Sequence, residues 1–291
     1  MPRSVLLLVN RDKPNAVKAL GGIRSLIERH GSIAGEIDAD DAPIAESKNT
    51  DLLMTLGGDG TLLAQARRCV GLGIPLVGVN FGRLGFLAEY DVEALTRFAP
   101  MLLGDEPLPV SERIMLSATV TRAGEAVFTD IALNDCAITA GPPYRVIEIG
   151  LGLDSNGGPT IRGDGVVVST PSGSTAYAVA AGGPIVAPGV NGISIIPIAA
   201  HSLAFRPIVA PSDSSIELTL LQGNRSDGQG GTTLVIDGQV QTPLETGDKV
   251  SIRQHEQCLK LVSNPESTFW RTLVRKMHWA VAPGQSDMGD S

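Results

Sequence analysis

Near Pro109 the spacing of apolar residues changes, and this change restricts the chain to a fold of two dissimilar parts. Before it, short apolar runs at 4–9, 51–56 and 74–79 alternate with segments that carry apolar residues at helical spacing, over 15–30 and 61–70. Strands that alternate with helices pair in parallel and form a layered α/β domain. We therefore predict a Rossmann-like α/β domain over 1–109, with ligands beyond the carboxyl ends of its parallel strands.

After Pro109 the apolar runs are short, rich in β-branched residues and separated by Gly, Pro, Asn and Asp. This pattern predicts a β-rich, sandwich-like domain over 110–267. Apolar residues then recur on one face of a helix predicted over 268–281. The polar tail at 282–291 is predicted to be disordered.

Composition narrows the classes of partner. The formal net charge of −8 argues against a sequence-independent nucleic-acid binder, which needs a basic face to displace counterions. Three widely spaced cysteines without a CxxC pair disfavour a disulfide framework or a zinc site. The amino-terminal apolar run is too short for a signal peptide, and no run is long enough to cross a membrane. We expect a cytoplasmic protein that binds neither nucleic acid nor membrane.

The stretch LGGDGT places one carboxylate, Asp59, in a glycine turn between a strand and a helix. Isolated Asp-Gly turns are commonly structural, but here Gly57, Gly58, Gly60 and Thr61 could point consecutive amides at a phosphate. Asp59 then has two alternative roles, accepting a proton from an attacking hydroxyl or holding Mg²⁺ against phosphates. No G-x-x-x-x-G-K-[ST] sequence occurs, so the turn is not a P-loop.

Two further clusters follow strands. VNFGRLGFL, over 79–87, lacks the spacing of a dinucleotide fingerprint and is either a tight turn or a ligand loop. IRGDGVVVSTPSGSTAY, over 161–177, combines Asp164 with hydroxyls and glycines that could cap a helix or bind phosphate and ribose. A serine hydrolase is disfavoured because no G-x-S-x-G elbow occurs, and His255-Glu256 is not followed by the second histidine of HExxH.

Together these motifs resemble the NAD kinase family, over about residues 50 to 280. The GGDG turn alone is weak, because phosphofructokinases and lipid kinases look similar there, whereas its combination with TPSGSTAY is specific. The motifs that carry the resemblance are GGDGT (57–61), NFGRLGFL (80–87), LND (133–135), RGDGVVVSTPSGSTAY (162–177), AGGP (181–184), HSLAFRPIV (201–209), DGQ (237–239) and FWRTLVRKMHW (269–279).

The resemblance implies that ATP phosphorylates the 2′-hydroxyl on the adenosine ribose of NAD, with a divalent metal, expected to be Mg²⁺. Asp59 would accept the proton, and no fixed protein ligand for the metal is predicted, although Asp59 could serve. The implied fold joins an α/β domain to a β-rich domain, with the last helix returning to the first. The turn residues assigned to ATP phosphates are Gly57, Gly58, Gly60 and Thr61. The residues assigned to NAD are Asp59, Gly60, Phe81, Asn134, Asp135, Arg145, Arg162, Asp164, Thr175, Ala176, Tyr177, Ala178, Val179, Ala180 and Gln239.

The resemblance also implies a homodimer or homotetramer with the NAD site near a subunit interface, where Arg162 and Asp164 would approach from a neighbour. Asp135 stands where many members have glutamate, and Ala178 and Ala180 replace common serines, so some contacts are shortened or lost. Two alternatives stay open. One is a kinase for a lipid or sugar phosphate that shares the GGDG turn, and the other is a nucleotide-binding sensor without catalysis.

Overall fold

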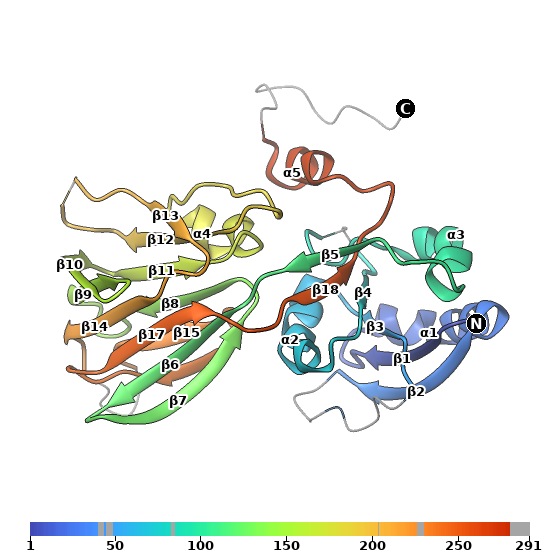
Figure 1. Cartoon of the computed structure of the whole chain (residues 1–291), viewed down its shortest axis with the longest axis horizontal. Helices are drawn as coiled ribbons and strands as arrows, with labels where there is room; N and C mark the ends of the chain where they lie inside the picture. Colours follow the sequence, from blue (N-terminus) through green and yellow to red (C-terminus); the bar gives the residue numbers. More distant parts are fainter. Residues whose placement is uncertain (40–43, 45–48, 83–84, 203, 226–229, 280–291) are drawn as a thin grey trace. The chain divides into compact units, whose positions relative to one another are not determined.

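A computed structural model describes residues 1–39, 44, 49–82, 85–202, 204–225 and 230–279. The chain divides into two compact units, residues 1–112 together with the chain from Leu259 onward, and residues 113–258 (Figure 1). The tail predicted to be disordered, at 282–291, lies outside the described residues, as do Arg83 and Leu84 of the NFGRLGFL motif.

The first unit is built on a sheet whose neighbouring strands β2, β1, β3, β4 and β18 pair in parallel. The apolar runs predicted to be buried strands form β1, β3 and β4, so the predicted parallel, Rossmann-like sheet is confirmed. In sheet order the strands are β2 (Ser32–Asp38), β1 (Ser4–Val9), β3 (Leu52–Leu56), β4 (Leu76–Val79), β18 (Leu259–Val262) and β5 (Val110–Arg113).

Helices cover both faces of this sheet (Figure 1). Helices α1 (Pro14–His30) and α3 (Val92–Leu103) share one apolar cluster with β1, β3 and β4. Helix α2 (Asp59–Cys69) packs on the other face, where Gly78 leaves room for Leu62: an added Cβ would lie 2.4 Å from Leu62 Cδ1.

Helix α2 begins two residues before the predicted start, because the Gly58 carbonyl accepts hydrogen bonds from the amides of Thr61 and Leu62. It also continues past the predicted stop as a 3₁₀ turn (Val70–Leu72). The turn ends where Gly73 adopts a φ of 66°, which favours glycine.

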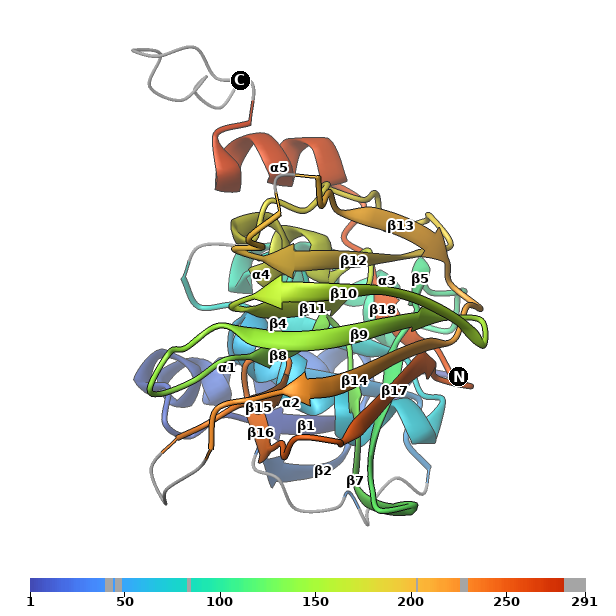
Figure 2. The same ribbon diagram turned by 90° about the vertical axis from the view of Figure 1, so that its left-hand side faces the viewer.

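The second unit consists of two antiparallel six-stranded sheets, so the predicted β-rich fold is confirmed. Figure 2 looks onto β10, β9, β14 and β17, which lie side by side. The first sheet runs β10 (Asn156–Gly163), β9 (Ile147–Leu153), β14 (Ile216–Gln222), β17 (Lys249–Gln254), β6 (Leu116–Arg122) and β7 (Glu125–Ala132). The second runs β13 (Ile208–Pro211), β12 (Gly192–Ile198), β11 (Gly165–Ser169), β8 (Asp135–Thr139), β15 (Thr233–Ile236) and β16 (Val240–Pro243).

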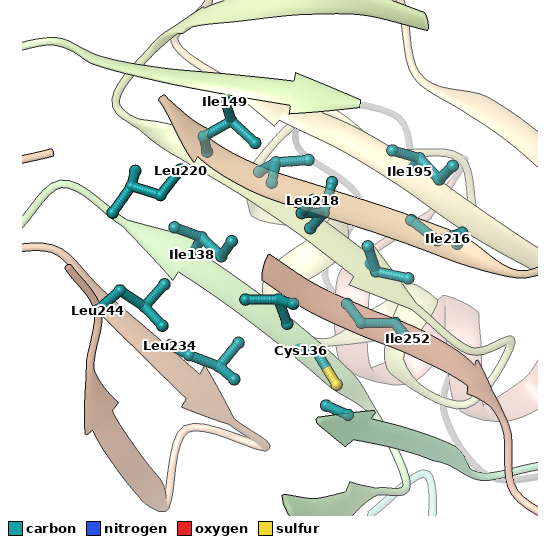
Figure 3. Packing of buried hydrophobic residues seen from close by; sticks show 14 of the residues in the cluster. Cys136, Ile138, Ile149, Ile195, Ile216, Leu218, Leu220, Leu234, Leu244 and Ile252 are labelled. Carbon is teal, nitrogen blue, oxygen red and sulfur yellow. The ribbon is translucent and has the colours of Figure 1, made fainter. Parts of the chain in front are cut away.

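Apolar side chains from both sheets meet in one core (Figure 3). Alternate residues of β6, Leu116, Ala118 and Val120, point into it, as the two-residue period of a strand requires. The other face of the second sheet is also buried, because Ala178 of the short helix α4 (Tyr177–Ala180) packs on Val167.

After β18 the chain stays bonded to the first unit. The Ser263 carbonyl accepts a hydrogen bond from the Tyr90 hydroxyl at 2.8 Å, and Asn264 Nδ2 donates to the Glu89 carbonyl at 3.0 Å. Helix α5 (Phe269–Met277) follows, capped by Thr268. Within the described residues, no helix has the length and apolar character that crossing a bilayer requires.

Candidate active site

The glycine turn after β3 places Asp59 in the first turn of α2. Gly58 precedes the helix in an extended conformation, and Gly57 is packed against Thr61, since an added Cβ would lie 2.4 Å from Thr61 Oγ1. Gly60 is exposed on the helix and has open space around its Cα. Asp59 therefore lies beyond the end of a parallel strand and at the positive end of a helix, where negative charge is favoured.

Both carboxylate oxygens of Asp59 accept hydrogen bonds from one loop. Oδ2 accepts from the amide of Phe86 at 2.9 Å, and Oδ1 accepts from Leu87 at 3.3 Å and Ala88 at 2.9 Å. Gly85 allows this close approach, because a Cβ there would lie 1.6 Å from Asp59 Oδ1. A carboxylate offers about four acceptor positions, so the loop fixes the side chain and leaves Oδ2 able to accept one further hydrogen bond or a proton.

Asn10, directly after β1, joins the neighbouring loop to this turn. Its Nδ2 donates to Thr61 Oγ1 at 2.9 Å, and its Oδ1 accepts from the amide of Asp12 at 3.1 Å. The carboxyl ends of β1 and β3 are adjacent in the sheet, so Asn10 and Asp59 belong to the same edge.

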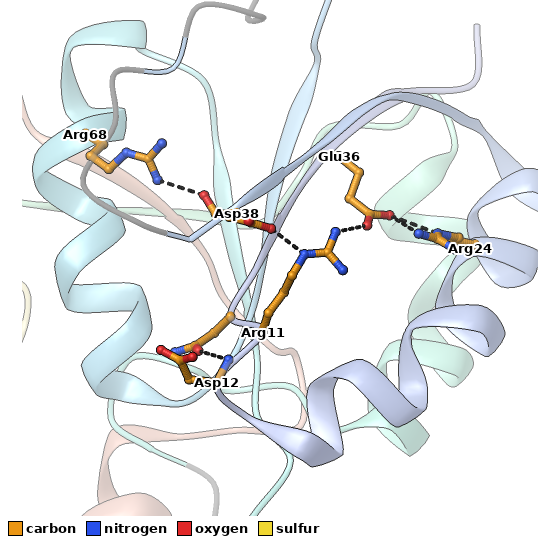
Figure 4. Close-up of polar contacts among 7 residues, drawn as sticks. Arg11, Asp12, Arg24, Glu36, Asp38 and Arg68 are labelled. Atoms are coloured by element: carbon orange, nitrogen blue, oxygen red, sulfur yellow. Dashed lines mark hydrogen bonds and ion pairs between the residues drawn. The ribbon is translucent and has the colours of Figure 1, made fainter.

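Charged side chains beside that loop are paired with one another (Figure 4). Arg11 contacts Glu36 at 2.8 Å and also Asp38, and Arg24 contacts Glu36 at 2.6 Å. The hydrogen bond to Asp38 is the main cause that raises the pKa of Arg11. This network ties the edge strand β2 to the loop after β1 and to α1.

In the second unit, Asp237 accepts hydrogen bonds from the backbone amides of the turn between β7 and β8. The Asp237 carboxylate accepts from the amides of Leu133 at 2.9 Å, Asn134 at 2.7 Å and Asp135 at 3.1 Å. In return, the Asp237 amide donates to the Asp135 carbonyl at 2.9 Å. One side chain therefore bonds all three amides of the segment that carries the predicted NAD-binding pair.

Thr170 donates hydrogen bonds to the backbone carbonyls of the same turn. Its hydroxyl donates to the Leu133 carbonyl at 2.6 Å and its amide to the Asn134 carbonyl at 2.9 Å. Gly173 closes the contact, since an added Cβ would lie 2.1 Å from the Asn134 carbonyl oxygen. Every backbone polar group of Leu133 and Asn134 thus has a partner.

The STPSGST run uses most of its hydroxyls inside the unit. Ser169 Oγ donates to the Thr170 carbonyl at 3.0 Å, and Ser174 Oγ donates to the Pro171 carbonyl at 2.7 Å. Ser169, Thr170 and Ser174 are fully buried. These three hydroxyls build the turn, whereas the partly exposed Ser172 and Thr175 remain accessible to a ligand.

The side chains of Asn134 and Asp135 contrast with their fully bonded backbone. Asn134 Oδ1 is buried and has no hydrogen-bond partner in the described part of the chain. Asp135 is only 4% exposed. Burial, reinforced by the negative charge of Asp237, raises the pKa of Asp135 to about 7. Because buried polar atoms are normally bonded, Asn134 Oδ1 is suited to accept from a ligand, and the Asp135 carboxyl can donate or accept.

The segment predicted to hold the nucleotide follows as a 3₁₀ turn (Gly173–Thr175) and α4. Tyr177 is 43% exposed, whereas the Ala178 methyl is fully buried against the second sheet. The Ala178 carbonyl accepts from the amide of Gly183 at 2.9 Å. Its methyl group and its carbonyl are therefore both used inside the unit. The other predicted residues here are at least partly exposed: Thr175, Ala176, Val179 and Ala180.

Three other residues predicted to bind the dinucleotide lie at the opposite end of β8 and β11. Asp135 pairs with Ser169 at one end of these strands, and the pairing continues for four more residues to Gly165. At about 3.4 Å per residue, the two ends are about 14 Å apart. The distant group consists of Arg145, Arg162 and Asp164.

This distant group is exposed. Arg162 pairs with Glu148 at 3.0 Å, and its side chain is 66% exposed. Asn224 fixes the loop that carries Arg145 by donating to the carbonyls of Ala140 at 3.0 Å and Arg145 at 2.9 Å. The structure therefore groups Arg145, Arg162 and Asp164 with one another rather than with Asn134.

Phe81 and Gln239 have different surroundings. Phe81 is partly buried and packs on the core of the first unit. Gln239 is exposed, two residues beyond Asp237, in the turn between β15 and β16.

The carboxylates near this turn suit a metal ion that binds mainly through substrate phosphates. Among the described residues, no group of three or more His, Cys, Asp or Glu side chains could hold a metal ion. Mg²⁺ commonly keeps several waters and takes one or two carboxylates plus substrate phosphates. The remaining acceptor position on Asp59 Oδ2 fits one such ligand.

Asp237 and Gly85 also belong to this site, although their motifs predicted no role for them. The Asp-Gly pair after a strand did signal a turn, and Asp237 and Gly238 have φ values of 52° and 66°. The amides that Asp237 binds lie about a hundred residues earlier, so local spacing could not reveal them.

Family models of known proteins match two separate parts of this chain. A family model of the ATP-NAD kinase N-terminal domain matches residues 28–106, and one of the C-terminal domain matches residues 133–264. An NAD kinase of Aromatoleum aromaticum is 40% identical over 80% of this chain and 75% of its own length. An NAD kinase of Azoarcus sp. is 35% identical over 97% of both chains.

Two solved structures share the fold. Yeast NADH kinase complexed with NADH has a TM-score of 0.81 at 21% identity, covering 98% of this chain and 90% of its own. An NAD kinase from Archaeoglobus fulgidus in complex with ATP has a TM-score of 0.69 at 24% identity, covering 90% and 94%. At these identities the likeness extends to the fold alone.

Proposed function

This chain belongs to the NAD kinase family, and we therefore infer that it transfers the γ-phosphoryl group of ATP to the 2′-hydroxyl of the adenosine ribose of NAD, giving NADP. Asp59 is the proton acceptor. The observation that carries this role is the remaining acceptor position on Asp59 Oδ2, in a side chain that three backbone amides otherwise hold in place.

The chemistry explains why a fixed carboxylate is needed. A ribose hydroxyl is a poor nucleophile near neutral pH, and phosphoryl transfer depends chiefly on alignment and charge neutralisation. As the new oxygen–phosphorus bond forms, the hydroxyl proton passes to Asp59 Oδ2, and the bond to the β-phosphate oxygen of ATP breaks. General-base assistance of about 10² to 10⁴ corresponds to roughly 3 to 5 kcal/mol of barrier.

Two features support the binding roles. The glycine turn of Gly57, Gly58, Gly60 and Thr61 opens a helix, whose start favours phosphate. Gly57 and Thr61 would shape this turn, because their amides donate to the carbonyls of Val79 and Gly58 at 3.0 Å. A bound Mg²⁺ would neutralise the charge of the triphosphate without a fixed protein ligand, because the remaining acceptor position of Asp59 Oδ2 takes the hydroxyl proton. In the second unit, Asn134 Oδ1 and the Asp135 carboxyl bind ribose hydroxyls of NAD, and the accessible residues of 175–180 line the nucleotide site.

Arg145, Arg162 and Asp164 serve the NAD site of a neighbouring subunit in a homodimer or homotetramer. Their separation from Asn134, by about 14 Å along the strands, and their exposure support this assignment. A cytoplasmic location fits the three free cysteines.

The test is Asp59→Asn, assayed with ATP, Mg²⁺ and NAD by detecting NADP with an NADP-specific dehydrogenase. We expect kcat to fall by at least about 10² while calorimetry still detects NAD binding. The matched control is Asp51→Asn, because Asp51 is an exposed aspartate of the same unit that also accepts a backbone amide, from Ser4 at 2.9 Å. Near wild-type turnover of Asp59→Asn would remove Asp59 from the mechanism.

A further inference from the structure

The buried carboxylate of Asp237 accepts hydrogen bonds from backbone amides. It is 6% exposed, and its carboxylate accepts from three consecutive amides at 2.7 to 3.1 Å. Hydrogen bonds to an ionised group are stronger than those between neutral groups. This side chain therefore determines the path of the backbone through Leu133, Asn134 and Asp135.

Asp237 has an unusual backbone that serves the same contact. Its φ of 52° lies in the left-handed region, which aspartate tolerates better than most residues. With this turn, the Asp237 amide reaches the Asp135 carbonyl at 2.9 Å while the carboxylate reaches the three amides. A residue in a sparsely populated conformation persists where the surrounding structure fixes it.

Thr170 donates to the backbone carbonyls of Leu133 and Asn134. The backbone of this segment is therefore hydrogen-bonded through both its amides and its carbonyls. The side-chain atom Asn134 Oδ1 remains buried and without a partner in the described residues. A segment with a fully bonded backbone and one buried, unbonded side-chain oxygen is organised to bind a further molecule.

We propose that Asp237 is a positioning residue for NAD binding: its carboxylate holds the Leu133–Asp135 backbone so that the side chains of Asn134 and Asp135 meet the ribose hydroxyls of NAD in a preformed arrangement. This proposal rests on the proposed function of Asn134 and Asp135. Asp237 itself touches no substrate, since its carboxylate is directed at the amides. Asp237 would increase the affinity for NAD by lowering the conformational entropy that the binding segment loses when NAD binds.

The proposal predicts a change that is specific to NAD. Asp237→Asn keeps the size of the side chain but replaces one acceptor oxygen by an NH₂ group, which cannot accept from an amide. We expect KM for NAD to rise about 10-fold to 100-fold, the loss seen when residues that orient metal-binding side chains are replaced. KM for ATP should change less than about twofold, because the ATP turn lies in the other unit.

Asp248→Asn is the matched control. Asp248 is also a buried aspartate of the second unit, 1% exposed, and it accepts from the amide of Glu245 at 2.8 Å and from Arg122. It has no contact with the segment 133–135 among its hydrogen bonds. Asp248→Asn should therefore lower the melting temperature but leave KM for NAD unchanged, so an equal rise in both variants would overturn the proposal.

A second readout separates positioning from general stability. The negative charge of Asp237 helps to raise the pKa of Asp135. Removing that charge should move the ionisation of Asp135 to lower pH, and with it the corresponding limb in the pH profile of KM for NAD. The profile of Asp248→Asn should match that of the wild type, and an unshifted profile in Asp237→Asn would overturn the proposal.

Two further measurements keep the test decisive. If Asn134→Ala leaves KM for NAD unchanged, the proposed function of this segment fails; if Asn134→Ala raises it but Asp237→Asn does not, only the positioning role fails. In the wild-type protein, amide hydrogen exchange should show protection of residues 133–135 both with and without NAD. Rapid exchange of these amides in the NAD-free protein would overturn the proposal, even where Asp237→Asn does not fold.

Discussion

Replacing Asp135 by asparagine should make the unfolding free energy of the ligand-free protein, relative to the wild type, higher at pH 8 than at pH 5. In the wild type, burial and the charge of Asp237 raise the pKa of Asp135 from 3.8 to about 7. Between the two pKa values the folded protein therefore keeps a proton that the unfolded chain has largely lost. Asparagine carries no ionisable group, so the variant lacks this dependence.

The sign and size follow from proton linkage. Between the two pKa values the folded state binds more protons than the unfolded state, so the free energy of unfolding falls as the pH rises. One pKa unit corresponds to about 1.36 kcal/mol, and the interval from 3.8 to about 7 is worth about 4 kcal/mol in total. About 1.6 kcal/mol of this is already lost at pH 5, which leaves roughly 2.6 kcal/mol to be lost between pH 5 and pH 8.

The measurement is urea unfolding of the wild type and Asp135→Asn without nucleotide, at several pH values from 5 to 8. The quantity of interest is the difference in unfolding free energy between the two proteins, because other titrating groups cancel in it. Asp213→Asn is the control, since Asp213 is an exposed aspartate of the same unit. Its difference from the wild type should stay within about 0.5 kcal/mol.

We expect the difference for Asp135→Asn to move in favour of the variant by about 2 to 3 kcal/mol from pH 5 to pH 8. A constant difference, or one that moves in favour of the wild type, would refute the assignment of a protonated, buried carboxyl at this position.

Three other substitutions test the packing around the two units. Gly85→Ala should lower kcat by about 10² in the coupled NADP assay, because its Cβ would lie 1.6 Å from Asp59 Oδ1 and displace the carboxylate; unchanged kcat would contradict this geometry. Gly22→Ala, in an exposed part of α1 with open space around it, should instead raise stability by about 0.5 to 1 kcal/mol without affecting kcat. Arg122→Ala should destabilise the protein by about 1 to 3 kcal/mol in urea unfolding, since it removes the charge partner of the buried Asp248 carboxylate while the Arg122 side chain is itself 33% exposed; a loss below about 0.5 kcal/mol would contradict a stabilising pair.

Strands β1, β3 and β4 of the first unit were predictable because their signals are local. Continuous apolar runs such as 4–9 mark strands buried on both faces, and all five residues from Val5 to Val9 are fully buried. Strands β2, β5 and β18 and helix α3 were not predicted. For β18, a run of four residues at 259–262 has no local property that assigns it to a sheet formed almost two hundred residues earlier.

The candidate site was predictable to the extent that its residues form motifs. The turn at 57–61 was located from the spacing of its glycines, and the structure adds that the amides of 86–88 hold Asp59. The hydroxyls of Ser169, Thr170 and Ser174 show the limit of that approach. A serine or threonine that builds a turn and one that meets a ligand look alike in a sequence, and only burial separates them.

The position of β18 has a consequence for how the protein is made. The first unit lacks one strand of its sheet until the ribosome has produced the whole segment 113–258 and then residues 259–262. At about 5 to 20 residues per second, this interval is on the order of ten to thirty seconds. During that time β4 has an open edge, which invites pairing with a foreign strand. The nascent chain should therefore depend on chaperones until its last strand emerges.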